Sequence, residues 1–255
     1  MHYHREQERE QGFGFSCALA SAPAAPLAGS KASIDRVIGA VYYRGAEALF
    51  SPRMGGMAAR TTAHVTEGTP PRSTRIITCA NHKGGTGKTT TAVNVSAGLA
   101  LLTQQRVLLI DCDPRGHASL ALGIDIRHVR YSVTDLLMGA KPEVQALCWD
   151  PRANLHILPA NATLTDVERE LGRRGDSRLQ LTQALQPLLH AFDVMVIDTP
   201  PTLGLWTQAP LVASTDLLIP VDMGYFAFAG MRQLLDAVAR LRQEVPLTLA
   251  TPHIL

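Results

Sequence analysis

A glycine-rich turn between a buried strand and a helix constrains the fold of this chain more than any other feature of its sequence. Before the turn lies the short apolar and β-branched segment 76–80, which suits a buried strand. After it, apolar residues recur at helical spacing from Ala92 to Leu102. Glycine allows a curled backbone in which successive N–H groups point inward at an anion, and the following helix adds its positive amino end. The turn therefore predicts a phosphate-binding loop.

The residues of this loop predict that the phosphates belong to a nucleoside triphosphate with its magnesium ion. A Gly-Lys-Thr run at this offset lets Lys88 reach the β- and γ-phosphates and lets the Thr89 hydroxyl ligate Mg²⁺. A glycine-rich turn without a ligand is the alternative, and the strand–loop–helix context weighs against it. The residues predicted to bind the nucleotide are Lys83, Gly84, Gly85, Thr86, Gly87, Lys88, Thr89 and Thr90.

Short apolar segments alternate with helical patterns through the rest of the chain. Strands that are apolar throughout and alternate with helices imply a parallel sheet covered on both faces. The predicted fold class is therefore α/β, a P-loop NTPase with a mostly parallel sheet flanked by helices, which binds its ligand at the carboxyl ends of the strands. Further strands are expected at 106–110, 155–158, 194–197 and 217–221, and helical patterns at 167–171, 179–189 and 231–245.

The loop departs from the usual G-x-x-x-x-G-K-[ST] form, because His82 stands at the position of the first glycine and Lys83 follows it. In this it resembles the deviant Walker A family, which includes the ParA/Soj partition ATPases, MinD and the nitrogenase iron proteins. Two more segments, 107–119 and 196–201, resemble motifs of the same family. The first of them differs from the family pattern at two positions, with Arg115 where the family has Gln and His117 where it has Asn.

The resemblance, which spans about residues 74–245, implies roles for individual side chains. It implies that Lys83 reaches across a two-fold axis to the nucleotide of a partner subunit. It also implies that Asp113 orients the attacking water, while Asp111 and Asp198 hold Mg²⁺ through its waters. A helix cap or a solvated strand end is the alternative for each aspartate. The predicted catalytic residues are Lys83, Lys88 and Asp113, and the predicted metal ligands are Thr89, Asp111 and Asp198.

The same resemblance implies a function. ParA-like proteins bind ATP and form a dimer with the nucleotide sandwiched between the subunits. They attach to nonspecific DNA, and a ParB-type partner stimulates hydrolysis. We therefore expect an ATPase with ATP and Mg²⁺ as cofactors, which acts as a homodimeric switch in chromosome or plasmid partition.

Four other interpretations stay open. A MinD-like, membrane-cycling protein needs a C-terminal amphipathic helix, which this sequence does not offer. The second interpretation is an ATPase of the same type that positions polar or secretion machinery. An iron-protein-like reductase needs paired cluster cysteines, whereas the cysteines here are scattered. The fourth is an inactive fragment: family members continue past the helical pattern 231–245, so we expect a C-terminal truncation with the last strands missing, which puts adenine recognition and DNA binding in doubt. The cysteines are Cys17, Cys79, Cys112 and Cys148.

Residues 1–72 differ in composition from the rest of the chain, because they are rich in Ala, Gly, Ser and Pro. They are expected to be either a disordered extension or a stretch before a wrongly assigned start, with the ATPase domain at 73–255. The net charge of +2 gives no nucleic-acid footprint. No run of about 18 uncharged apolar residues occurs, so no membrane partner is expected. We expect a cytoplasmic protein, associated with the nucleoid if DNA binding is retained.

Overall fold

Apolar strands alternate with helices through the described part of the chain, as the sequence predicts. The computed structural model describes residues 74–141, 144–150, 154–171, 177–222 and 227–255. The predicted N-terminal extension or misassigned start, residues 1–72, lies outside the described residues. Cys17 and the side chain of Cys148 lie outside them as well, while Cys79 and Cys112 are free, buried thiols.

The strands of the described residues form one seven-stranded sheet. They are β1 (Arg75–Cys79), β2 (Val107–Asp111), β3 (Cys148–Asp150), β4 (Leu155–Leu158), β5 (Val194–Asp198), β6 (Asp216–Ile219) and β7 (His253–Ile254). The strand order is β3-β4-β2-β5-β1-β6-β7. Neighbouring strands pair in parallel, except β3, which pairs antiparallel with β4.

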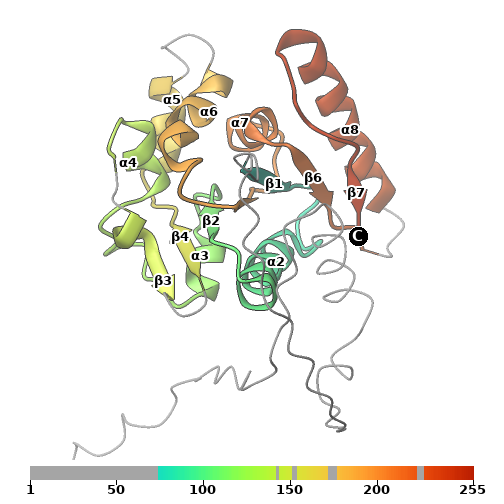
Figure 1. Ribbon diagram of the computed structural model, residues 1–255. Coiled ribbons are helices and arrows are strands. Elements are labelled where there is room, and N and C mark those ends of the chain that lie inside the picture. The colour runs from blue at the N-terminus through green and yellow to red at the C-terminus, as the bar shows by residue number, and fades with distance from the viewer. Residues whose placement is uncertain (1–73, 142–143, 151–153, 172–176, 223–226) are drawn as a thin grey trace, which may run out of the picture.

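Helices cover both faces of this sheet (Figure 1). The α-helices are α2 (Lys88–Thr103), α3 (His117–Ala121), α4 (Val133–Leu137), α5 (Leu164–Leu171), α6 (Gln180–Leu185), α7 (Leu205–Ala213) and α8 (Ala227–Glu244), and short 3-10 turns are η2 (Val144–Leu147), η4 (Ser177–Leu179) and η5 (Gln186–Leu188). One face carries α2 and α3, the other carries α4 to α7, and α8 packs beside β6. Within the ranges described, none of these helices has both the length and the apolar character to cross a bilayer.

The two faces of the sheet are apolar because successive side chains of a strand point to opposite sides. In β2, Leu108 packs with the helices of the α7 side, whereas Leu109 packs with α2. In β1, Ile76 and Ile77 divide in the same way. Strands buried on both faces need apolar residues at every position, which explains why the sequence shows continuous apolar runs and no alternation.

The predicted fold class is confirmed, and several elements differ in detail. The third expected strand has the predicted bounds, and the others shift by one or two residues. The helical pattern 179–189 divides into α6 and a 3-10 turn, η5, where Pro187 lacks the N–H that would continue the ladder. Beyond the expected strands, the last residues form β7, which pairs with β6 through Leu218 and His253.

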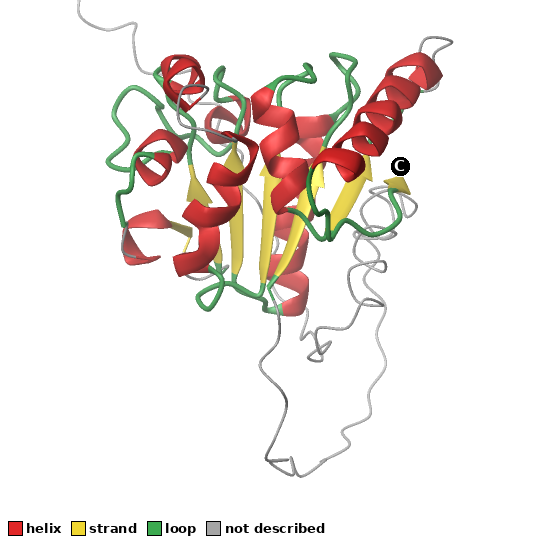
Figure 2. Cartoon of the chain, turned by 90° about the horizontal axis from the view of Figure 1, so that it is seen from above, coloured by secondary structure: helices red, strands yellow, loops and turns green. Residues whose placement is uncertain are grey.

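Three strand ends meet in register, and this arrangement builds the site. Asp198 at the end of β5 is the register partner of Cys79 in β1 and of Asp111 in β2. Because these strands are parallel, their carboxyl ends lie on the same edge of the sheet, as Figure 2 shows for the strands seen side by side. The chain that leaves β1 there forms the glycine-rich loop, so the predicted loop and carboxylates come together.

Candidate functional site

The glycine-rich loop joins the end of β1 to the start of α2. Gly85 and Gly87 have φ of 77° and 84°, in the left-handed region where a side chain is strained. A Cβ at either position would meet nothing within 4 Å, so the backbone conformation, and not crowding, is what requires glycine there. The residue before the loop, Asn81, donates to the Pro220 carbonyl oxygen at 2.8 Å and accepts from the Lys83 N–H at 3.1 Å. The loop entry is thus tied to the end of β6.

Lys88 points back into the loop that precedes it. Its side chain is buried, and Nζ donates to the carbonyl oxygen of Lys83 at 2.8 Å. Burial lowers the pKa of Lys88, and the carboxylates of Asp198 and Asp113 oppose that shift. A buried cation with a single carbonyl partner is suited to an anion that enters the loop.

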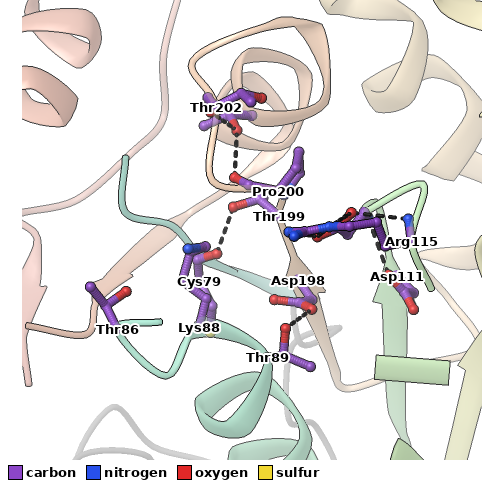
Figure 3. Close-up of polar contacts among 12 residues, drawn as sticks. Cys79, Thr86, Lys88, Thr89, Asp111, Arg115, Asp198, Thr199, Pro200 and Thr202 are labelled. Carbon is purple, nitrogen blue, oxygen red and sulfur yellow. Dashed lines mark hydrogen bonds and ion pairs between the residues drawn. The ribbon is translucent and has the colours of Figure 1, made fainter. Parts of the chain in front are cut away.

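Asp198 lies opposite the start of α2 (Figure 3). Its Oδ2 accepts from the Thr89 hydroxyl at 2.7 Å, while its Oδ1 is buried with no hydrogen-bond partner among the described residues. Burial, reinforced by repulsion from Asp111, raises the pKa of Asp198 to about 7. An unpaired buried carboxylate oxygen costs free energy, and a cation or a water held by a cation would satisfy it.

The described residues fit a magnesium ion that is shared with a substrate. No group of three or more His, Cys, Asp or Glu side chains among them is arranged to hold a metal alone. Mg²⁺ ordinarily keeps several waters and takes one or two protein oxygens together with substrate phosphates. The Thr89 hydroxyl and the orphan oxygen of Asp198 supply that kind of partial shell.

Asp111 is held by its own loop. Its Oδ1 accepts from the Asp113 N–H at 3.1 Å, and its Oδ2 accepts from the N–H and the hydroxyl of Ser119 at 2.8 and 2.7 Å. Burial raises the pKa of Asp111, and the Ser119 bonds act against that rise. The carboxylate therefore fixes the loop after β2 directly, and its predicted part in holding Mg²⁺ through water stays a prediction.

Asp113 and Lys83 each lie in an ion pair that the sequence does not reveal. Asp113 is buried and bonded to Arg115. The Nζ of Lys83 contacts Oδ2 of Asp222 at 2.5 Å, between side chains that are 34% and 39% exposed. Asp222 follows β6, whose carboxyl end lies at the same edge of the sheet, and only this tertiary neighbourhood identifies it.

The remaining predicted residues lie along the loop with unequal exposure. Thr86 is buried, and its hydroxyl donates to the Lys83 carbonyl oxygen at 3.4 Å. Gly84 and Thr90 are exposed. Thr199 is not among the predicted residues, yet its hydroxyl donates to the Cys79 carbonyl oxygen at 2.8 Å and so joins the ends of β5 and β1. A Thr directly after the strand-ending Asp198 was the available signal.

Comparisons with known proteins show the family of this chain. Residues 74–251 match a family model described as an AAA domain. The chain is 38% identical over 169 residues to the chromosome partitioning protein ParA of Myxococcus xanthus, covering 66% of this chain and 59% of that protein. It is 38% identical over 171 residues to the sporulation initiation inhibitor protein Soj of Bacillus subtilis, covering 67% of each.

A solved structure shares the fold of this chain. The chain is similar to cobyrinic acid a,c-diamide synthase from Mycobacterium smegmatis with bound ATP analog and magnesium, with a TM-score of 0.62 and 36% identity over 70% of this chain and 74% of that one. The chain therefore belongs to the ParA/Soj-type partition ATPase family, as its motifs indicated. It spans 59% to 63% of the length of several curated relatives that it matches.

The raised pKa of Asp198 predicts a pH-dependent effect of Asp198→Asn on the stability of the ligand-free protein. An aspartate whose folded-state pKa lies above its unfolded value of 3.8 contributes stability at low pH that is lost as the pH rises through 7. Asn carries no such charge. The free energy of unfolding of Asp198→Asn, relative to that of wild type, should therefore rise by about 2 kcal/mol between about pH 5 and about pH 8.

Urea unfolding in EDTA at the two pH values measures this difference. Asp236→Asn, at an exposed position of α8, is the matched control and should differ little from wild type at either pH. An Asp198→Asn effect of equal size at both pH values would contradict the assignment of a protonated, buried carboxyl.

Proposed function

We propose that this chain is an ATP-binding and ATP-hydrolysing dimerisation switch for chromosome or plasmid partition. The observation that carries the proposal is the meeting of three groups at one sheet edge: the buried Lys88 ammonium under the loop, the Thr89 hydroxyl, and the unpaired oxygen of Asp198. They complement a triphosphate with its cation in charge and in hydrogen bonding. The solved relative with bound ATP analog and magnesium supports the same ligand.

In this proposal the protein's own groups position the triphosphate and neutralise its charge. The loop N–H groups and Lys88 bind the phosphate oxygens, and the Thr89 hydroxyl and Asp198 hold Mg²⁺, which neutralises charge on the β- and γ-phosphates. Asp111 supports the cation site through water. Water attacks the γ-phosphorus, so that one P–O bond forms, the bond to the bridging oxygen breaks, and ADP and phosphate leave. Asp113 orients that water.

The switch follows from what ATP contributes to the dimer. When Lys83 of one subunit contacts the nucleotide of the other, loss of the γ-phosphate removes the differential affinity that favours the dimer. A ParB-type partner accelerates that loss. The relatives named as partition proteins favour this role over the positioning of another cargo.

Hydrolysis by matched variants tests the enzymatic part of the proposal. Lys88→Ala and Asp113→Ala should each lower ATP turnover about a hundredfold or more, because each removes a positioned charge that acts on the transition state. Lys141→Ala removes a lysine at an exposed position and should leave turnover unchanged. Phosphate release is the measurement. Equal background rates for wild type and all three variants would favour an inert protein.

The ion pair of Lys83 predicts how dimer formation responds to Asp222. Lys83 cannot contact a partner's nucleotide while its ammonium stays on Asp222, so Asp222→Asn should favour the dimer. Loss of this partly exposed ion pair should change the dimer dissociation constant by about two- to fivefold. Lys83→Ala should abolish the nucleotide-dependent dimer.

Sedimentation across a dilution series with Mg²⁺ and a non-hydrolysable ATP analogue measures both effects. Lys141→Ala again serves as the control that removes a lysine elsewhere. A weaker dimer for Asp222→Asn, or a normal dimer for Lys83→Ala, would remove Lys83 from the proposed interface.

A further inference from the structure

Arg115 binds the carboxylate of Asp113 with its side chain and its backbone at once. The backbone N–H of Arg115 donates to Oδ1 at 3.0 Å. The guanidinium Nε lies 3.1 Å from Oδ1 and 3.2 Å from Oδ2, and Nη2 donates to Oδ2 at 2.7 Å. The pair is asymmetric in exposure, since the Asp113 side chain is 3% exposed and the Arg115 side chain 54%.

This pairing occupies the carboxylate that the proposed mechanism needs. A carboxylate has about four lone-pair positions, and a bidentate guanidinium with an added N–H takes most of them. To orient a water, Asp113 must accept a hydrogen bond from it, so that water must displace one of these donors. The carboxylate is therefore not available to a water while all these contacts are made.

The guanidinium also lies close to the rest of the site. Burial lowers the pKa of Lys88, and the charge of Arg115 adds to that lowering; the hydrogen bond to Asp113 raises the pKa of Arg115, and the charge of Asp198 adds to that rise. In Figure 3 the Arg115 side chain extends from the loop after β2 toward Asp198. The pair therefore belongs to the edge where the phosphates are proposed to bind.

The backbone around the pair is fixed, whereas the side chain has room to rotate. The Gly116 N–H donates to the Asp113 carbonyl oxygen at 2.8 Å, which closes the turn. Gly116 has φ of 65°, and a Cβ there would lie 2.8 Å from the Ile126 side chain, so the turn is held in one conformation. Opening the pair thus requires only that the exposed guanidinium rotate into solvent or onto a ligand.

A second turn in the same chain provides an internal reference. Asp125 and Arg127 repeat the same spacing and three of the four contacts, with the Arg127 N–H at 3.0 Å, Nε at 2.9 Å and Nη2 at 2.8 Å from the carboxylate oxygens. There, however, both side chains are exposed, at 41% and 79%. The turn geometry is therefore ordinary in itself, and what distinguishes Asp113 is that its paired carboxylate is buried at the proposed site.

We infer that Arg115 is a positioning residue that holds Asp113 in a paired, non-productive state, so that the pair must open before ATP is hydrolysed. The inference rests on the proposed ATPase function and adds to it a restraint built into this chain. The restraint lies at one of the two positions, Arg115 and His117, where the motif differs from its family pattern.

The rate of a single turnover at saturating Mg·ATP tests the inference in the full chain. Arg115→Gln keeps one donor nitrogen and loses the charge, so it cannot form the two-nitrogen contact; the rate should rise about fivefold, the factor by which a partly exposed ion pair depletes the open state. Arg115→Lys keeps the charge without the fork, and its rate should fall between wild type and Arg115→Gln. Arg127→Gln removes the reference pair and should leave the rate unchanged.

Two further measurements separate a positioning role from a structural one. Asp113→Asn/Arg115→Gln should hydrolyse no faster than Asp113→Asn, because Arg115 acts through Asp113. Circular dichroism melting reports whether each variant folds, and if Arg115→Gln does not fold, Arg115→Lys decides the question. If Arg115 only supports the fold, Arg115→Gln should hydrolyse ATP more slowly than wild type or not at all.

The outcomes distinguish this inference from the proposed function. A wild-type chain that binds Mg·ATP and hydrolyses it, with Arg115→Gln equal to it or slower, would overturn the inference and leave the function standing. A folded wild-type chain that binds no nucleotide would remove both.

Discussion

Incomplete neutralisation of charge at one sheet edge is the physical constraint on which the rest of the structure depends. The parallel register places Asp198 between the ends of β1 and β2, and burial there leaves one of its oxygens unpaired. Among the described residues, the buried Lys88 has a loop carbonyl as its one hydrogen-bond partner. Such groups destabilise a fold unless a ligand satisfies them. The folded site therefore favours the binding of a triphosphate with its cation.

Two partly exposed cations beside the site are paired within the same chain. Lys83 contacts Asp222, and Arg115 contacts Asp113. Each pair is partly exposed, so each can open at small cost when a phosphate competes for the cation. In our account, the ligand-free chain thus keeps the lysine that would contact a partner, and the aspartate that would orient water, away from those tasks. Nucleotide binding and the pairing of subunits would release them.

The parts that could be predicted from sequence depend on local pattern. Buried parallel strands require continuous apolar runs, and the phosphate loop requires glycines with positive φ at Gly85 and Gly87, so both are visible in one short segment. The parts that were missed depend on tertiary contact. Asp222 lies 139 residues from Lys83, and no spacing rule connects them. Helix α7 contains Pro210. A proline in the sequence predicts the end of a helix, yet α7 continues through it because the helix packs against β1 and α6.

Calorimetric titration of the folded chain with ATP tests the central claim most directly. The account predicts uptake of nucleotide that requires Mg²⁺, and an affinity at least about tenfold weaker in EDTA, because the unpaired oxygen of Asp198 and the Thr89 hydroxyl then have no cation to hold. A folded sample that takes up no nucleotide, or takes it up equally well without Mg²⁺, would contradict it.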